Sequence, residues 1–216
     1  RAVIVGSPSS YGKGTVQEIL DLDSLLDYYY PRATGYKPLG ALKLTIEKFY
    51  RINGGSTQYK GVSSDVVLPD PYAYLEKGEQ TLDYALPWDQ VKPLNYKKST
   101  EELAIPELRA RSAQRLAANP NFTTVQRYIE QNKADQEQSR LPLQWKKFIE
   151  AQRTLRLETK KLDELKSTGT GLVYRTLETS CLDPDRAQII QEWLEQLRTD
   201  FYLEETIWIM TDLIEA

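Results

Sequence analysis

The pattern of hydrophobic and polar positions divides the chain in two, and its first part, residues 1 to about 70, predicts β-structure. Residues 2–5 are a run of branched apolar side chains, which suits a buried strand. Residues 41–50 alternate, with Leu and Ile on one face and Lys, Thr and Glu on the other, as in a half-exposed strand. Residues 66–68 predict a further short apolar strand.

Turn signals and ambiguous segments lie between these strands. Residues 53–55, Asn-Gly-Gly, tolerate positive φ and predict a tight turn, with residues 56–60 as the returning strand of a hairpin. Residues 15–20 fit either a strand or a helix. Three consecutive tyrosines, Tyr28–Tyr30, begin a segment punctuated by proline and glycine, which predicts an aromatic loop packed on the protein.

From residue 105 onward the apolar residues recur at helical spacing. One helix around residues 108–116 is stopped by Asn119-Pro120, and a second follows over residues 122–129. A third runs from Trp145 as far as Leu165.

Two further helices are expected near the end of the chain. Asp183 can cap the first of them, and Pro184 suits its first position because no hydrogen bond is lost there. The last helix is expected to bury one face, made of Leu203, Ile207, Met210 and Ile214.

These patterns predict an α+β protein with three segments. Residues 1–70 form the β-rich part, residues 71–104 a connector rich in proline, and residues 105–216 a helical domain. Because the connector also holds several aromatic side chains, we expect it to pack across a surface.

Composition and charge narrow the classes of function. The 216-residue chain has 28 Lys and Arg against 31 Asp and Glu, a net charge of −3, which argues against a nucleic-acid partner bound through a basic face. It has no histidine and one cysteine, Cys181, so histidine-dependent catalytic units and internal disulfides are excluded. No apolar run has the length of a membrane span. We expect neither a metal nor another cofactor.

Candidate chemistry concentrates at Gly12-Lys13-Gly14-Thr15. A phosphate-binding loop is a remote reading, because Gly6 is one residue too far from Gly12 and a glycine replaces the hydroxyl residue after the lysine. A lysine in a confined site can instead lose its charge and serve as a general base for a serine. If the segment were helical, Gln17 would share a face with Lys13 and could orient its amine. The plain alternative is a solvated turn lysine.

Seven stretches of the sequence carry a further signal: residues 1–6 (RAVIVG), 11–17 (YGKGTVQ), 40–46 (GALKLTI), 49–54 (FYRING), 56–62 (STQYKGV), 65–69 (DVVLP) and 200–206 (DFYLEET). In this order they resemble the tail-specific (carboxyl-terminal processing) serine proteases of peptidase family S41. The resemblance is strong over residues 1–70 and looser in the helical part.

The resemblance implies roles for two residues: Lys13 as the general base and Gln17 as the residue that orients it. The nucleophilic serine of the family lies upstream of this motif, and the loop serines Ser7, Ser9 and Ser10 do not match it. The chain begins within what reads as a folded element, so we expect a fragment that is inactive alone. The resemblance further implies protein or peptide substrates for the parent and a periplasmic location.

A second class of function stays open. Residues 105–216 carry no recognisable catalytic constellation, so the helical part can equally be a non-catalytic interaction or regulatory module that docks an adaptor protein. The acidic residues Asp21, Asp23 and Asp27 lack the glycine and glutamate of a calcium loop and are expected to be solvated.

Overall fold

The computed structural model describes residues 2–32, 34–75, 77–97, 102–137, 142–165, 171–176 and 183–216. Cys181 lies outside the described residues. The chain forms two compact units: a helical unit of Arg1–Pro8, Ser64–Leu75 and Thr100–Ala216, and a ribbon unit of Ser9–Ser63 and Glu76–Ser99. Within these described ranges, six α-helices and two small sheets confirm the α+β class.

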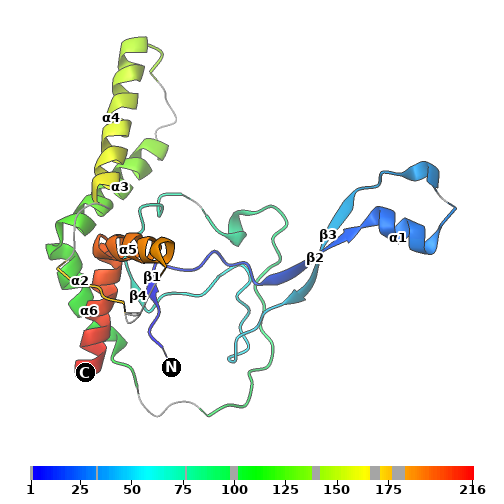
Figure 1. Ribbon diagram of the computed structural model, residues 1–216, viewed down its shortest axis with the longest axis horizontal. Helices are drawn as coiled ribbons and strands as arrows, with labels where there is room; N and C mark the ends of the chain where they lie inside the picture. The colour runs from blue at the N-terminus through cyan, green and yellow to red at the C-terminus, as the bar shows by residue number, and fades with distance from the viewer. Residues whose placement is uncertain are drawn as a thin grey trace. The chain divides into compact units, whose positions relative to one another are not determined.

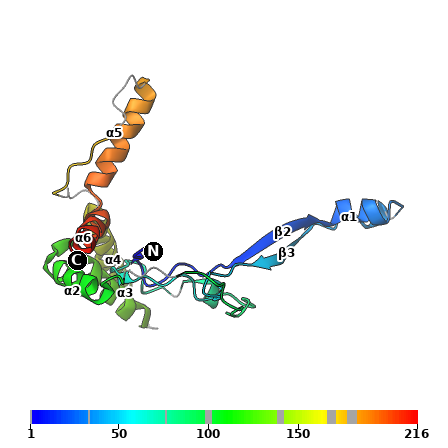
Figure 2. The same ribbon diagram turned by 90° about the horizontal axis from the view of Figure 1, so that it is seen from below.

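The ribbon unit is built on two antiparallel strands, β2 (Thr15–Asp21) and β3 (Ala41–Lys48). The ambiguous residues 15–20 are therefore a strand, and the alternating residues of β3 are a strand as predicted. Helix α1 (Leu22–Tyr29) and the 3₁₀ helix η1 (Thr34–Tyr36) join the two strands. In Figures 1 and 2, β2 and β3 form a narrow ribbon with α1 at its end.

The packed aromatic loop expected at Tyr28–Tyr30 is wrong. Asp21 begins α1 instead: its carboxylate accepts hydrogen bonds from the Ser24 hydroxyl (2.6 Å) and the Asp23 amide (3.1 Å). These bonds lower the pKa of Asp21, the bond from Ser24 most. Helix α1 carries Tyr28 and Tyr29. Sequence reasoning missed that Asp21, one of three nearby acidic residues, is the N-cap of this helix. Tyr28 is 79% exposed.

The hairpin expected after β3 is also wrong. Residues 53–55 do form the predicted turn, in which the Arg51 amide donates to the Gly55 carbonyl (2.9 Å). Beyond a single bridge between Tyr50 and Ser56, however, no strand returns along β3 in this described segment, since β2 is its partner. The backbone does not continue as a strand here. The Gln58 side chain is buried, and Tyr59 has a left-handed φ of 73°.

The described connector residues between 77 and 97 belong to the ribbon unit and pack within it, as expected from the aromatic content of the connector. The Glu79 amide, in the 3₁₀ helix η2 (Glu79–Thr81), donates to the Tyr11 carbonyl (2.8 Å). The Trp88 indole donates to the Ser56 carbonyl (3.0 Å). An ion pair of Lys48 with Asp89 (2.9 Å) fixes the next turn and lowers the pKa of that carboxyl.

The helical unit combines a short parallel pair of strands with five helices. Strand β1 (Val5–Gly6) pairs with β4 (Val66–Val67). The helices are α2 (Ile105–Ala118), α3 (Pro120–Glu137), α4 (Trp145–Leu165), α5 (Pro184–Arg198) and α6 (Phe201–Glu215).

The core of this unit joins β4 to three helices. Its buried apolar residues, among those that the structure describes, are Val66, Leu68, Leu108, Leu116, Phe122, Val125, Phe201 and Ile209. Asn119 ends α2 and Asp183 caps α5, both as predicted. The Tyr202 hydroxyl of α6 donates to the Pro69 carbonyl just beyond β4 (2.7 Å), and burial raises the pKa of this tyrosine.

Helix α6 buries a different face from the one expected. Its buried residues are Phe201, Glu205, Ile209 and Asp212, whereas Met210 and Ile214 are 54% and 78% exposed. Two of these buried positions are acidic, so hydrophobic periodicity alone places the face wrongly. Their partners come from α2, a helix almost a hundred residues earlier.

Two arginines of α2 pair with the buried acids of α6. Arg115 contacts Glu205 (2.9 Å) and Asp212 (2.7 Å), and Arg111 contacts Asp212 (3.2 Å). Burial acts to raise the pKa of Asp212, but the hydrogen bonds from Arg115 and Arg111 outweigh it and the pKa is lowered. The side chain of Asp212 is only 12% exposed, so these bonds are poorly screened by solvent.

We expect Asp212→Asn to lower the free energy of unfolding at pH 7 by roughly 2 kcal/mol, because charge-assisted hydrogen bonds are lost. A carboxyl with a lowered native pKa stabilises the fold above its unfolded pKa, near 3.8, and that stabilisation is lost as pH falls through the native value. Urea unfolding measured between pH 7 and pH 3 should therefore show that the difference in free energy of unfolding between Asp212→Asn and the unaltered chain becomes smaller as the pH falls. Asp135→Asn, at an exposed position of α3, is the control. A gap that stays constant with pH contradicts the expectation.

Candidate active site

Lys13 and Gln17, the two residues singled out by sequence, contact one another in the ribbon unit. The Lys13 ammonium donates to Gln17 Oε1 (2.8 Å). Gln17 Nε2 in turn approaches the Thr45 hydroxyl on β3 (3.4 Å), which turns the amide oxygen toward the lysine. The Lys13 side chain is exposed, and among the described residues Gln17 is the hydrogen-bond partner of its amine. The amine therefore keeps an open side.

The geometry of this contact differs from the helical one considered above. Lys13 precedes β2 and Gln17 lies within it, in register with Thr45. The pair therefore meets without a helix. Between Val16 and Gln17 the register of β2 with β3 shifts by one residue, so that Ile46 of β3 has no partner in β2.

The same strand assignment removes the phosphate-loop reading. A phosphate-binding loop needs a helix after the lysine, whose free amides hold the phosphate. Here Lys13 leads directly into β2.

A cavity of about 310 Å³ lies beside the lysine, within the ribbon unit. Its charged lining is balanced: Lys13 and Lys43 on one hand, Glu79 and Asp83 on the other. Its apolar lining, Leu82 and Leu86, belongs to the connector. Such a cavity can accept a small number of side chains of a bound peptide.

The two glycines around Lys13 allow its backbone to lie directly on residues 57–61. A Cβ on Gly14 would lie 2.2 Å from the Gln58 nitrogen, and one on Gly12, whose φ is +92°, would lie 2.8 Å from the Tyr59 oxygen. Both contacts are with backbone, which cannot move aside cheaply. The lysine is therefore carried by a turn that only glycines can form at this spacing.

Sequence reasoning missed the buried polar pair beneath this turn. Gln58 is fully buried; its Oε1 accepts the Gly14 amide (2.7 Å) and its Nε2 donates to Glu79 Oε1 (3.0 Å). Glu79 is 8% exposed. The available signal was the pair of glycines, which requires a close partner somewhere, but nothing in the sequence identifies that partner.

The loop serines are not brought to the amine by any contact in the described residues. Ser10 has a structural role: its hydroxyl accepts the Val62 amide and its own amide donates to the Val62 carbonyl, both at 3.0 Å. The acidic residues of α1 also serve local structure. Asp23 accepts the Leu39 amide (2.8 Å) and Asp27 pairs with Lys37. Within the described part of the chain, no group of three potential metal-ligating side chains occurs.

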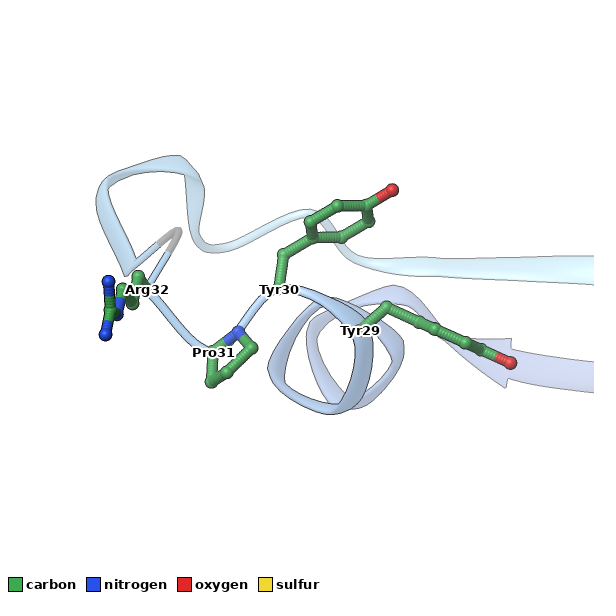
Figure 3. A pocket seen from close by; sticks show the side chains of 4 residues that line it. All are labelled: Tyr29, Tyr30, Pro31 and Arg32. Atoms are coloured by element: carbon green, nitrogen blue, oxygen red, sulfur yellow. The ribbon is translucent and has the colours of Figure 1, made fainter.

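Tyr28–Tyr30 lie at the other end of β2 from this site. An open cavity of about 490 Å³ lies at the end of α1 and is lined by Tyr29, Tyr30, Pro31 and Arg32. Figure 3 shows these four side chains. The seven residues of β2 separate the cavity from Lys13, a span of about 23 Å at the usual rise per strand residue. The cavity therefore belongs to a separate surface from the lysine site.

We expect Gly14→Ala to destabilise the ribbon unit by roughly 1 to 3 kcal/mol, because the new methyl group overlaps the Gln58 backbone. Gly35→Ala is the matched control, since a Cβ there meets nothing within 4 Å. Urea unfolding of both variants makes the comparison. Equal stability of the two would contradict the close packing of the turn.

Comparison with known proteins gives two family matches. Residues 1–68 match Peptidase family S41, and residues 72–215 match the C-terminal domain of tail specific protease (DUF3340). The chain is 33% identical over 150 residues to a tail-specific protease of Haemophilus influenzae, an alignment that covers 68% of this chain and 21% of that protein. The chain thus spans about a fifth of the length of this relative. No helix among the described residues is long and apolar enough to cross a bilayer. On these matches, the chain belongs to the tail-specific protease family, with a peptidase S41 segment followed by the family's C-terminal domain.

Proposed function

We propose that this chain is the part of a serine-type endopeptidase that carries the general base, Lys13, and that the parent protein cleaves proteins recognised by their C-terminal tails. The observation that carries the proposal is the contact of Lys13 with Gln17, made by a turn that only glycines allow. Membership of the S41 family supplies the reaction class. Within this chain, which has no histidine, Lys13 is the residue that the family resemblance matches to the base.

In this mechanism the neutral amine of Lys13 takes the proton from a serine hydroxyl while the serine oxygen attacks the peptide carbonyl. The resulting ammonium then returns the proton to the leaving amine as the peptide bond breaks. The Gln17 carbonyl, a neutral acceptor, orients the amine through both states. Water hydrolyses the acyl-serine by the same proton transfers in reverse.

The serine belongs to a part of the parent protein that this sequence does not contain. A segment that brings it against Lys13 would also cover the open side of the amine and remove water, which favours the uncharged base. The 216-residue chain alone is accordingly inactive in this proposal. We propose a periplasmic location for the parent, on the basis of the family resemblance.

We expect Lys13→Ala in the full-length parent to reduce turnover of a peptide substrate at least a thousandfold, on the order seen when a base in a catalytic unit is removed, with peptide binding retained. Lys92→Ala, at an exposed connector position, is the control. Binding is measured by fluorescence anisotropy and turnover by product formation. Unchanged turnover in Lys13→Ala, or rapid Lys13-dependent cleavage by the isolated chain, overturns the assignment.

A second role, protein docking by the helical unit, is favoured by helix α5. Among its residues, all of which the structure describes, none is buried, and Ile189 and Trp193 are 65% and 53% exposed. In Figure 2, α5 extends away from α2, α3 and α6. Large exposed apolar side chains on one helix are typical of a surface that binds another protein.

We expect Trp193→Lys in the parent to leave hydrolysis of a short peptide unchanged and to slow degradation of a protein substrate about tenfold, since loss of an interface tryptophan costs about 1 to 3 kcal/mol. Gln191→Lys, at an exposed neutral position of the same helix, controls for the added charge. Equal effects on peptide and protein, or no effect on either, contradict a docking role.

A further inference from the structure

We propose that Gln58, with its amide orientation set by Glu79, is the residue that positions the general base Lys13. This inference rests on the proposed function, because it concerns the same lysine. Its basis is a chain of buried hydrogen bonds that begins at Glu79, passes through the Gln58 side chain and ends on the backbone amide next to Lys13.

The first step is the amide orientation of Gln58. Its Nε2 donates to Glu79 Oε1 (3.0 Å), and a carboxylate can only accept. The carbonyl end of Gln58 must therefore face Gly14, whose N–H needs an acceptor. In the reversed orientation two donors would face each other at Gly14, and two acceptors at Glu79. Because the Gln58 side chain has no exposed surface, water cannot correct such a mismatch.

The second step is the tethering of the turn on both sides of Lys13. On one side Gly14 donates to Gln58 (2.7 Å). On the other, the Gly12 carbonyl accepts the Tyr59 amide (2.7 Å), and the Tyr11 carbonyl accepts the Glu79 amide (2.8 Å). The backbone groups of Lys13 make none of these three hydrogen bonds. The main chain of Lys13 is held by the bonds of the residues on either side of it. Only the torsions of its side chain remain, and Gln17 limits those.

The third step is the origin of the two partners. Gln58 lies in the segment that matches peptidase S41, and Glu79 in the segment that matches the C-terminal domain. The positioning of the base thus depends on residues from both family segments. A general base misplaced by about 1 Å can cost on the order of a hundredfold in rate, so loss of this hydrogen-bond chain should be visible in catalysis.

The test uses the full-length parent with Gln58→Met, which keeps the side-chain length and removes both hydrogen bonds. We expect kcat per folded molecule to fall roughly ten- to a hundredfold, while KM changes less than about twofold. The folded fraction is measured by circular dichroism. Gln80→Met, an exposed glutamine in η2, is the matched control. A role limited to stability would lower the folded fraction and leave kcat per folded molecule unchanged, which overturns the proposal.

An exchange of the two groups keeps the test independent of folding defects. Gln58→Glu places two carboxylates about 3 Å apart, which cannot both be ionised without cost, and should lower kcat. Adding Glu79→Gln restores the pattern, because the new amide donates to the new carboxylate, which still accepts the Gly14 amide. We expect the double variant to recover at least about tenfold in kcat over Gln58→Glu. No recovery in a folded double variant contradicts the proposal.

Failure of the positioning role of Gln58 can be distinguished from failure of Lys13 as the general base. If Lys13→Ala abolishes turnover while Gln58→Met retains full kcat, the base assignment stands and the positioning role fails. If Lys13→Ala retains full turnover, the lysine is not the base and both fail.

Discussion

The close approach of the Gly12–Gly14 turn to residues 57–61 is the constraint on which the lysine site depends. At this approach the backbone amide of Gly14 leaves solvent and needs an acceptor in the interior. Gln58 supplies it, and the buried amide then requires its own acceptor, which is Glu79. Because Gly12 and Gly14 have no Cβ atoms, the backbone can approach this closely. The buried Gly14 amide then requires the Gln58 carbonyl as its acceptor, and the Gln58 amide requires Glu79, a residue of the connector.

The two family segments are interleaved in the fold of this chain. The S41 segment contributes β1 and β4 to the helical unit, where Val66 and Leu68 are buried in the same core as helices α2, α3 and α6. The C-terminal segment contributes η2 and the following residues to the ribbon unit, through Trp88 and Asp89. Each unit therefore holds residues of both family segments.

Sequence reasoning succeeded where a local signal fixes local structure. The alternation in β3, the stop at Asn119-Pro120 and the cap at Asp183 each act within a few residues. The pairing of Lys13 with Gln17 was also expected, although through a helix that the structure replaces with a strand.

Failures of sequence reasoning arose where partners are distant in sequence. Gln58 looks like an exposed strand residue until Glu79 and Gly14 are seen around it. The acids of α6 look solvated until Arg111 and Arg115 are placed beside them. Buried polar residues interrupt the spacing of apolar residues, so hydrophobic periodicity assigns the buried face of α6 to the wrong side of the helix. The boundaries at residues 70 and 104 remain a prediction.

Amide hydrogen exchange at Gly14 in the folded chain, followed by NMR, tests the central claim most directly. If its N–H is buried against the Gln58 carbonyl, exchange should be slowed by several orders of magnitude relative to an open peptide, and comparable to that of the amides paired between β2 and β3. Exchange at the rate of an exposed loop amide would show that the turn is not held, and the account of how the lysine is positioned would then be wrong.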